Sequence, residues 1–223
     1  MNNKANHVRY NKELNDVEGG QLSAVAQNLF FYICSRVREH KDEVVNISFD
    51  SIVANTGFTA SGDKALVEKL LDMNRALLDL NYEYVAADGI IIQGGIFSTF
   101  ITNTVEKTLS IRVNKDLLFL LNDLDANFTD WELAEFVHIR SVYSKRLYRL
   151  IKEWNRNKET PYFAIEDIRN KMGVSENCEN KKFMSKIFMP ACEEMKNYFP
   201  DFSFEVFRKP EKGAPISAIC FSF

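Results

Sequence analysis

The chain has 223 residues with a formal net charge of −3, and 46% of the residues are hydrophobic and 26% charged. This composition is typical of a folded globular protein of one or two domains, and it excludes a largely disordered chain. No run of apolar residues approaches the roughly 18 to 20 needed to cross a bilayer, and residues 1–11 lack the apolar core of a secretion signal. We therefore expect a cytoplasmic protein without membrane contact.

Cysteine usage argues against disulfides and metal sites. The four cysteines lie far apart without a CxxC pair, and only three histidines accompany them. We expect reduced, mostly buried thiols, no bound metal and no cofactor. The cysteines are Cys34, Cys178, Cys192 and Cys220.

The first half of the chain predicts a helix, a strand and a helix-turn-helix. An apolar stripe with spacings of three and four predicts a helix over 21–39. Alternating apolar positions predict a strand over 44–49, and a short helix should follow and end near Gly57. A second helix is expected over 63–80. Helix, tight turn and helix then stand in the order of a DNA-binding motif.

A β-structure follows these helices. The Asp88-Gly89 pair is a hairpin turn signal, with strands expected over 82–86 and 90–93. A longer ribbon of 95–102 and 108–113 is expected to extend this wing.

A domain boundary is expected near residue 125. A short helix over 115–122 is followed by the acidic, polar stretch 123–130. We therefore divide the chain into an N-terminal domain of residues 1–124 and a C-terminal domain of residues 125–223.

The second domain repeats the plan of the first. In order, we expect a long helix over 131–156, a strand over 161–165, a short helix over 166–172 ending at Gly173, a helix over 180–198, and a hairpin of 202–208 and 216–223. The predicted fold is α+β, with two tandem winged-helix domains.

Positive charge is concentrated in the second half. Residues 138–186 hold twelve Lys and Arg against six Asp and Glu, a balance of +6, whereas residues 1–120 hold twelve against fifteen, a balance of −3. A nucleic-acid-binding protein needs a cationic face against phosphates. The second domain meets this requirement better than the first.

Candidate DNA-binding residues follow from the winged-helix order. The second helix of the turn lies in the major groove, and residues near its N-terminus reach base edges. A basic side of the preceding long helix would contact phosphates. The wing would reach the adjacent DNA backbone or minor groove. The equivalent helix of the first domain offers fewer candidate DNA-binding residues.

The base-reading group is Asn180, Lys181, Lys182, Ser185 and Lys186. The phosphate-contacting group on the preceding helix is Ser144, Lys145, Arg146, Tyr148, Arg149 and Lys152. The wing group is Arg208, Lys209 and Lys212, and the group in the first domain is Ser61, Lys64 and Lys69. The alternative for the lysine groups is a solvated charged face, and for the wing a solubilising turn.

Enzymatic interpretations find no support in the sequence. DNA nicking by a tyrosine beside a metal needs a His-hydrophobic-His motif, which none of the three histidines forms. The stretch from Gly57 to Lys64 imitates a phosphate loop, but Asp63 stands where that motif has lysine. The Glu193-Glu194 pair has no His or metal ligand near it in sequence. We expect a protein that is not an enzyme.

The second half resembles the iteron-binding replication initiators of bacterial plasmids. The resemblance is carried by residues 141–152, Ser-Val-Tyr-Ser-Lys-Arg-Leu-Tyr-Arg-Leu-Ile-Lys, which are similar to the family signature on the first helix of its second winged helix. Further matches are residues 128–136, residues 168–173, the Pro190-Ala191 pair and the strand 216–223. The first half matches more weakly, through residues 22–31, Gly57 and residues 97–100 and 109–114.

The resemblance implies a sequence-specific initiator that binds repeated sites, the iterons, in double-stranded DNA of a plasmid origin, promotes origin opening and represses its own gene. It further implies dimers and monomers, with the first domain forming the dimer contact, and host partners such as a helicase or its loader. The acidic first domain departs from this pattern. Two alternatives stay open: a tandem winged-helix transcriptional repressor without initiation activity, and a protein-interaction module.

Overall fold

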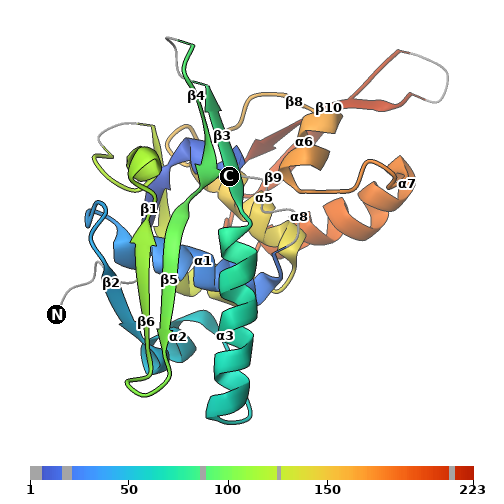
Figure 1. Ribbon diagram of the computed structural model, residues 1–223. Coiled ribbons are helices and arrows are strands. Elements are labelled where there is room, and N and C mark those ends of the chain that lie inside the picture. Colours follow the sequence, from blue (N-terminus) through green and yellow to red (C-terminus); the bar gives the residue numbers. More distant parts are fainter. Residues whose placement is uncertain (1–6, 17–21, 86–88, 125–126, 211–213) are drawn as a thin grey trace. The chain divides into compact units, whose positions relative to one another are not determined.

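The computed structural model describes residues 7–16, 22–85, 89–124, 127–210 and 214–223 (Figure 1). The contacts divide the chain into two compact units, Met1–His138 and Ile139–Phe223. The boundary thus lies between residues 138 and 139 and not near residue 125. The reason is that the strand and helix over 128–138 pair and pack with elements of the first unit.

Unit 1 contains the first helix-turn-helix. Its elements are α1 (Ala24–Val37), β2 (Val45–Ser48), α2 (Phe49–Thr56) and α3 (Asp63–Leu78). The Ser23 and Ser48 hydroxyls cap α1 and α2, each accepting from a backbone N–H three residues on. Gly57 ends α2 with φ of +67°, a left-handed conformation that glycine adopts without strain.

The wing of unit 1 is a three-stranded antiparallel sheet. Strands β5 (Phe97–Asn103) and β6 (Thr108–Val113) form the hairpin, and β2 joins it in the order β2-β6-β5. The green strands β5 and β6 are long in Figure 1, and α3 packs against β5. The helix η3 (Lys115–Leu120) follows β6.

The hairpin of β3 (Asn81–Val85) and β4 (Ile91–Gly95) forms a separate two-stranded sheet. The expectation of one continuous wing from 82 to 113 is therefore wrong. The chain bends between β4 and β5, and Asn114 holds the bend: its backbone N–H donates to Ile96 O and its side-chain amide donates to Gly95 O.

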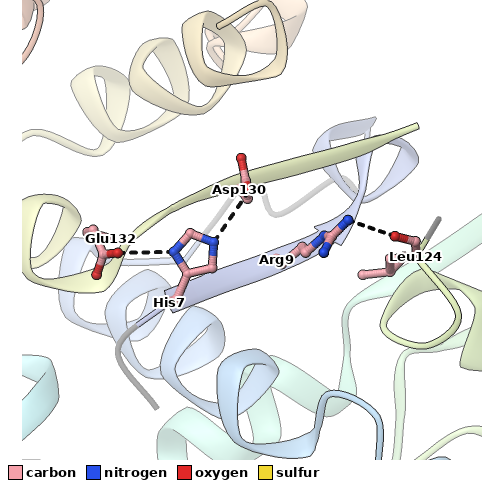
Figure 2. Close-up of polar contacts among 5 residues, drawn as sticks. All are labelled: His7, Arg9, Leu124, Asp130 and Glu132. Atoms are coloured by element: carbon pink, nitrogen blue, oxygen red, sulfur yellow. Dashed lines mark hydrogen bonds and ion pairs between the residues drawn. The ribbon is translucent and has the colours of Figure 1, made fainter. Parts of the chain in front are cut away.

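Strand β1 (His7–Asn11), absent from the sequence prediction, pairs antiparallel with β7 (Phe128–Glu132) in register from His7 opposite Glu132 to Asn11 opposite Phe128. Figure 2 shows the His7 ring between two carboxylates, with Nε2 3.4 Å from Asp130 Oδ2 and Nδ1 3.1 Å from Glu132 Oε1. Arg9 donates to Leu124 O at 2.9 Å. The short helix η2 (Lys12–Asp16) follows β1.

The single long helix expected over 131–156 is wrong. The chain forms the end of β7, then α4 (Leu133–His138), and after a break α5 (Val142–Glu153). The break is set by Ser141, whose hydroxyl accepts from the backbone N–H groups of Tyr143 and Ser144 and so caps a new helix. Helix α4 belongs to unit 1 and α5 to unit 2.

An aromatic cluster forms the core of unit 1. The Phe31 ring of α1 lies 5.4 Å from Tyr10, 5.1 Å from Trp131 and 5.2 Å from Phe136, measured between ring centroids. All four side chains are buried, so β1, β7 and α4 close over α1. Such aromatic contacts contribute beyond the area they remove from water.

Unit 2 repeats the plan of unit 1. Its elements after α5 are β8 (Phe163–Ala164), α6 (Ile165–Lys171), α7 (Asn180–Lys182), η4 (Phe183–Phe188), α8 (Met189–Met195), β9 (Ser203–Arg208) and β10 (Ile216–Ser222). The strand order β8-β10-β9 matches β2-β6-β5 of unit 1. Each unit thus has the predicted winged-helix sequence of elements.

The segments α7, η4 and α8 form one helical run from residue 180 to residue 195, and its middle part is a π-helical turn. Pro190 lies just after this turn. Proline has no N–H to donate, and its ring crowds the carbonyl four residues earlier, which gives a physical reason for the wider turn here. The Phe188 ring anchors the run against Phe204 and Phe221 of the wing sheet, at centroid distances of 5.2 and 6.1 Å.

Candidate nucleic-acid interface

The helical run of residues 180–195 has one apolar face and one cationic face. Phe183, Phe188, Cys192 and Met195 are buried against the rest of unit 2. All five residues expected to read bases on this helix are exposed: Asn180, Lys181, Lys182, Ser185 and Lys186. The run therefore presents lysine side chains and a hydroxyl to solvent within its first two turns.

Two of these five side chains already have partners within the protein. The Asn180 Oδ1 atom accepts a hydrogen bond of 2.9 Å from Arg169, which occupies one of its two lone pairs. Reading adenine with asparagine requires a donor and an acceptor together, so this contact restricts the orientations in which Asn180 could read a base. Ser185 donates to Lys181 O at 2.8 Å and keeps its lone pairs available. Lysine side chains therefore dominate the chemistry of the face.

Three residues expected to contact phosphates are buried. Ser144, Lys145 and Tyr148 on α5 have exposed fractions of 1%, 0% and 0%. The Tyr148 ring packs on Tyr198 and Phe199, at 5.8 and 5.6 Å between centroids. A spacing of three to four residues places these side chains on one side of the helix, but that side faces the core. Their assignment as direct DNA contacts is therefore wrong for this conformation.

Burial changes the acid–base behaviour of Lys145. It lowers the pKa of the Lys145 amine to about 7, and the Glu194 carboxylate on α8 opposes this shift. Glu194 also accepts a hydrogen bond from the backbone N–H of Arg140, just before α5. Lys145 and Glu194 thus belong to a polar contact between α5 and the helix that carries the lysine face.

The other three basic residues of α5 are half-buried. The Lys152 Nζ atom lies 5.0 Å from the Tyr148 ring centroid and 5.1 Å from that of Phe199. Burial and the neighbouring Arg149 lower the pKa of Arg146 to about 10, which leaves its guanidinium charged at neutral pH. Arg146, Arg149 and Lys152 therefore offer cationic groups with restricted access.

The wing of unit 2 supplies exposed cations. Arg208 and Lys209 are exposed, and Arg208 donates to Ala214 O at 2.8 Å across the base of the turn. The Lys209 backbone N–H donates to Pro215 O. Lys212, the third residue expected here, lies outside the described residues.

In unit 1 the corresponding helix α3 is electrically balanced. Ser61, Lys64 and Lys69 are exposed, as a DNA contact requires. However, Lys64 lies 4.0 Å from Glu68, and Lys69 donates to Thr59 O at 2.7 Å. Asp63, at the start of α3, lies 2.7 Å from Lys107, and this contact raises the pKa of that amine. The helix therefore presents little excess positive charge.

The two units carry opposite net charge. Residues 1–138 hold 12 Lys and Arg against 20 Asp and Glu, a balance of −8, whereas residues 139–223 hold 16 against 11, a balance of +5. The two values add to the −3 of the whole chain. Attraction to phosphates is therefore a property of unit 2.

Among the described residues, no group of three or more His, Cys, Asp or Glu is arranged to hold a metal ion. In the same part of the chain, no helix has the length and apolar character that would let it cross a membrane. All four cysteines are free, and three of them are buried: Cys34, Cys192 and Cys220.

Arg169, which sequence reasoning did not select as a site residue, contacts the first residue of the lysine-bearing helix. From the sequence alone, Arg169 is a cation in the last turn of a short helix, a position that the helix dipole favours. Only the three-dimensional arrangement brings it to Asn180.

Comparison with known proteins places the chain in a family. Residues 7–152 match the model of a family described as "Initiator Replication protein, WH1". A protein of Bifidobacterium longum (strain NCC 2705), described as "Probable replication protein rep", is 36% identical over 148 residues, which are 66% of this chain and 50% of that protein. The chain thus spans about half the length of this curated relative.

A solved structure has the same fold over the whole chain. The crystal structure of Pi initiator protein in complex with iteron DNA matches with a TM-score of 0.74 at 18% identity, covering 100% of this chain and 98% of that one. At this identity the likeness concerns the fold. It confirms the prediction of an α+β fold with tandem winged-helix domains.

Proposed function

The chain belongs to the family of initiator replication proteins, and on this premise we propose that it binds repeated sites in double-stranded DNA at a plasmid origin and promotes opening of the origin. The observation that carries the proposal is the exposed lysine face of residues 180–186, on a unit with a net charge of +5. A helix in this position of a winged helix enters the major groove.

Within the proposed complex the basic groups have different tasks. Lys182 and Lys186 are placed to donate to guanine O6 and N7. Arg149 and Lys152 on α5, with Arg208 and Lys209 on the wing, would contact phosphates and so position the protein without reading sequence. Unit 1, with a net charge of −8, contributes little attraction to DNA.

Unit 1 is better suited to contact a second copy of the chain. Its hairpin β3–β4 exposes apolar side chains, with exposed fractions of 60% for Val85 and 60% for Ile91. Exposed apolar side chains gathered on one hairpin favour protein contact. We expect homodimers and monomers, with the dimer contact in unit 1, and recruitment of host replication proteins such as a helicase or its loader. Plasmid DNA is cytoplasmic, so the protein would act in the cytoplasm, and the proposal assigns it no catalytic step.

The proposal is tested by fluorescence anisotropy with the purified protein and duplexes that carry the repeats flanking its own gene. Random duplex serves as competitor at physiological salt. Specific binding to several direct repeats supports the initiator. Binding to a single inverted repeat favours a repressor without initiation activity, and no specific binding contradicts both.

Salt dependence provides a further control on the mode of binding. If about six phosphates are contacted, affinity should fall by about 10³ between 50 and 200 mM salt. A protein-interaction module would show no such salt-dependent binding to DNA.

A further inference from the structure

Arg169 is a buried cation at the centre of the second helix-turn-helix. It lies in the last turn of α6, and its exposed fraction is 9%. A buried guanidinium is unfavourable unless acceptors surround it. The acceptors around Arg169 therefore show which segments of the chain this side chain connects.

The guanidinium of Arg169 reaches both ends of the loop that leads to the lysine-bearing helix. Its Nη2 group donates to Ser175 O at 3.3 Å and to Cys178 O. Its Nη1 group donates to Asn180 Oδ1 at 2.9 Å, on the first residue of α7. One planar side chain thus joins α6, the loop and the start of the next helix.

An aromatic contact fixes the orientation of this group. The guanidinium carbon lies 5.2 Å from the ring centroid of Phe183, which is fully buried. Phe183 is separated by one residue from Lys181 and lies beside Lys182. The position of Arg169 is therefore coupled to the part of the helix that presents the lysines.

The start of this helix has no side-chain cap of its own. Glu179 occupies the N-cap position without a side-chain hydrogen bond to the backbone of the helix. In α5, by contrast, the Ser141 hydroxyl caps the first turn directly. In unit 2 the contact of Arg169 with Asn180 ties the helix start to α6 from the side.

We propose that Arg169 is a positioning residue, which acts through Asn180 and the loop carbonyls to fix where the lysine-bearing helix starts and hence which bases Lys182 and Lys186 meet. This inference rests on the proposed function. It assigns specificity to a side chain that is too buried to touch DNA, and it makes Asn180 the link to the helix.

The first test is Arg169→Lys, which keeps the charge but cannot donate to three acceptors in one plane. The specificity ratio, defined as Kd for random duplex divided by Kd for the repeats, should fall by about tenfold, a change equal to about 1.4 kcal/mol. Affinity for random duplex and its salt slope should stay at the wild-type values, because the phosphate-contacting groups are unchanged. Lys158→Met, at an exposed lysine of the same unit, is the matched control and should leave the ratio unchanged.

A double-mutant cycle tests the link through Asn180. If Asn180 acts only through Arg169, Asn180→Ala should lower the ratio in the wild type and cause no further loss in the Arg169→Lys variant. Additive losses would mean that Asn180 reads a base itself, and the proposed link would be wrong. A fall in thermal stability with an unchanged specificity ratio would also overturn the proposal.

Amide hydrogen exchange gives a readout that needs no DNA. In Arg169→Lys, amides over residues 174–182 should exchange faster than in the wild type, while those of α5 stay protected. If the wild type fails to distinguish repeats from random duplex, the proposed function fails, and the exchange rates still decide whether Arg169 holds the helix start. Unchanged exchange over 174–182 would overturn the positioning role.

Discussion

The guanidinium of Arg146 occupies the space that a Cβ atom on Gly173 would take. Gly173 follows α6 with φ of +64°, and Gly57 follows α2 in unit 1 with φ of +67°. A Cβ on Gly57 would meet only Val137 Cγ1, at an ordinary contact distance of 3.5 Å. The two glycines therefore share a backbone conformation and differ in their surroundings.

This difference predicts unequal effects of alanine substitution. Gly57→Ala should lower the free energy of unfolding by about 1 to 2 kcal/mol, the cost of a left-handed conformation with a side chain. Gly173→Ala should cost up to about 1 kcal/mol beyond that, because the tip of the half-buried Arg146 side chain must move aside. Urea unfolding followed by fluorescence measures both effects, with Trp131 reporting on unit 1 and Trp154 on unit 2 in single-tryptophan backgrounds. Adding Arg146→Ala to Gly173→Ala should restore the additional unfolding free energy that Gly173→Ala loses. Equal losses at both glycines would contradict the prediction.

Burial of Lys145 predicts a pH-dependent stability of unit 2. The folded-state pKa is about 7, below the ordinary value of 10.5, so between these values the unfolded chain holds a proton that the folded chain lacks. Stability should therefore rise with pH over this range, and below about pH 7 the full destabilisation is present. At about 1.4 kcal/mol per pKa unit, the rise should be roughly 2 to 4 kcal/mol.

Lys145→Met removes this group and should flatten the dependence of stability on pH. Urea unfolding between pH 6.5 and pH 9 provides the measurement. The same variant should leave the salt slope for random DNA unchanged, whereas Lys209→Met, at an exposed wing lysine assigned to phosphate contact, should reduce it by about 0.9. A reduced slope in Lys145→Met would show that Lys145 contacts phosphate after all.

The plan of both units could be predicted because it depends on local patterns. The apolar spacing of Leu66, Leu70 and Leu77 indicates α3, and all three side chains are buried. The turn glycines and the alternating strands are equally local signals. The winged-helix order follows from these elements alone.

Features set by distant residues could not be predicted in this way. Strand β1 has only Val8 and Tyr10 as buried positions, and its partner β7 lies about 120 residues further along the chain. Spacing placed Lys145 and Tyr148 on one side of α5, but it does not tell which side packs on the core. The role of Arg169 depends on a loop whose path no local pattern specifies.

Base reading and phosphate contact predict different losses of affinity. Lys182→Met or Lys186→Met should reduce the preference for the repeats by about 1 to 3 kcal/mol with little effect on random duplex. Arg149→Ala should weaken binding to all sequences alike. Competition anisotropy at fixed salt measures the two effects. Equal losses on repeats and random duplex for the lysine variants would refute base reading by these side chains.

The exposed hairpin of unit 1 predicts where a dimer forms. Ile91→Lys places a charge on the apolar hairpin and should shift the protein toward monomer, because burying an unpaired charge is unfavourable. Val105→Lys is the control, since Val105 is 89% exposed in the β5–β6 turn. Sedimentation velocity over a range of concentrations measures the shift. An unchanged association in Ile91→Lys would place the dimer contact elsewhere.

The pairing of β1 with β7 has a consequence for biosynthesis. Ribosomes add about 5 to 20 residues per second, so β1 emerges roughly ten seconds before its partner strand, with His7 opposite Glu132 at the far end of the ladder. During that time Tyr10 has no Trp131 to pack against, although the two rings lie 6.3 Å apart in the finished unit. Unit 1 therefore completes its fold only when the segment that leads into unit 2 is being made. The completion of unit 1 and the start of unit 2 synthesis thus fall close together in time.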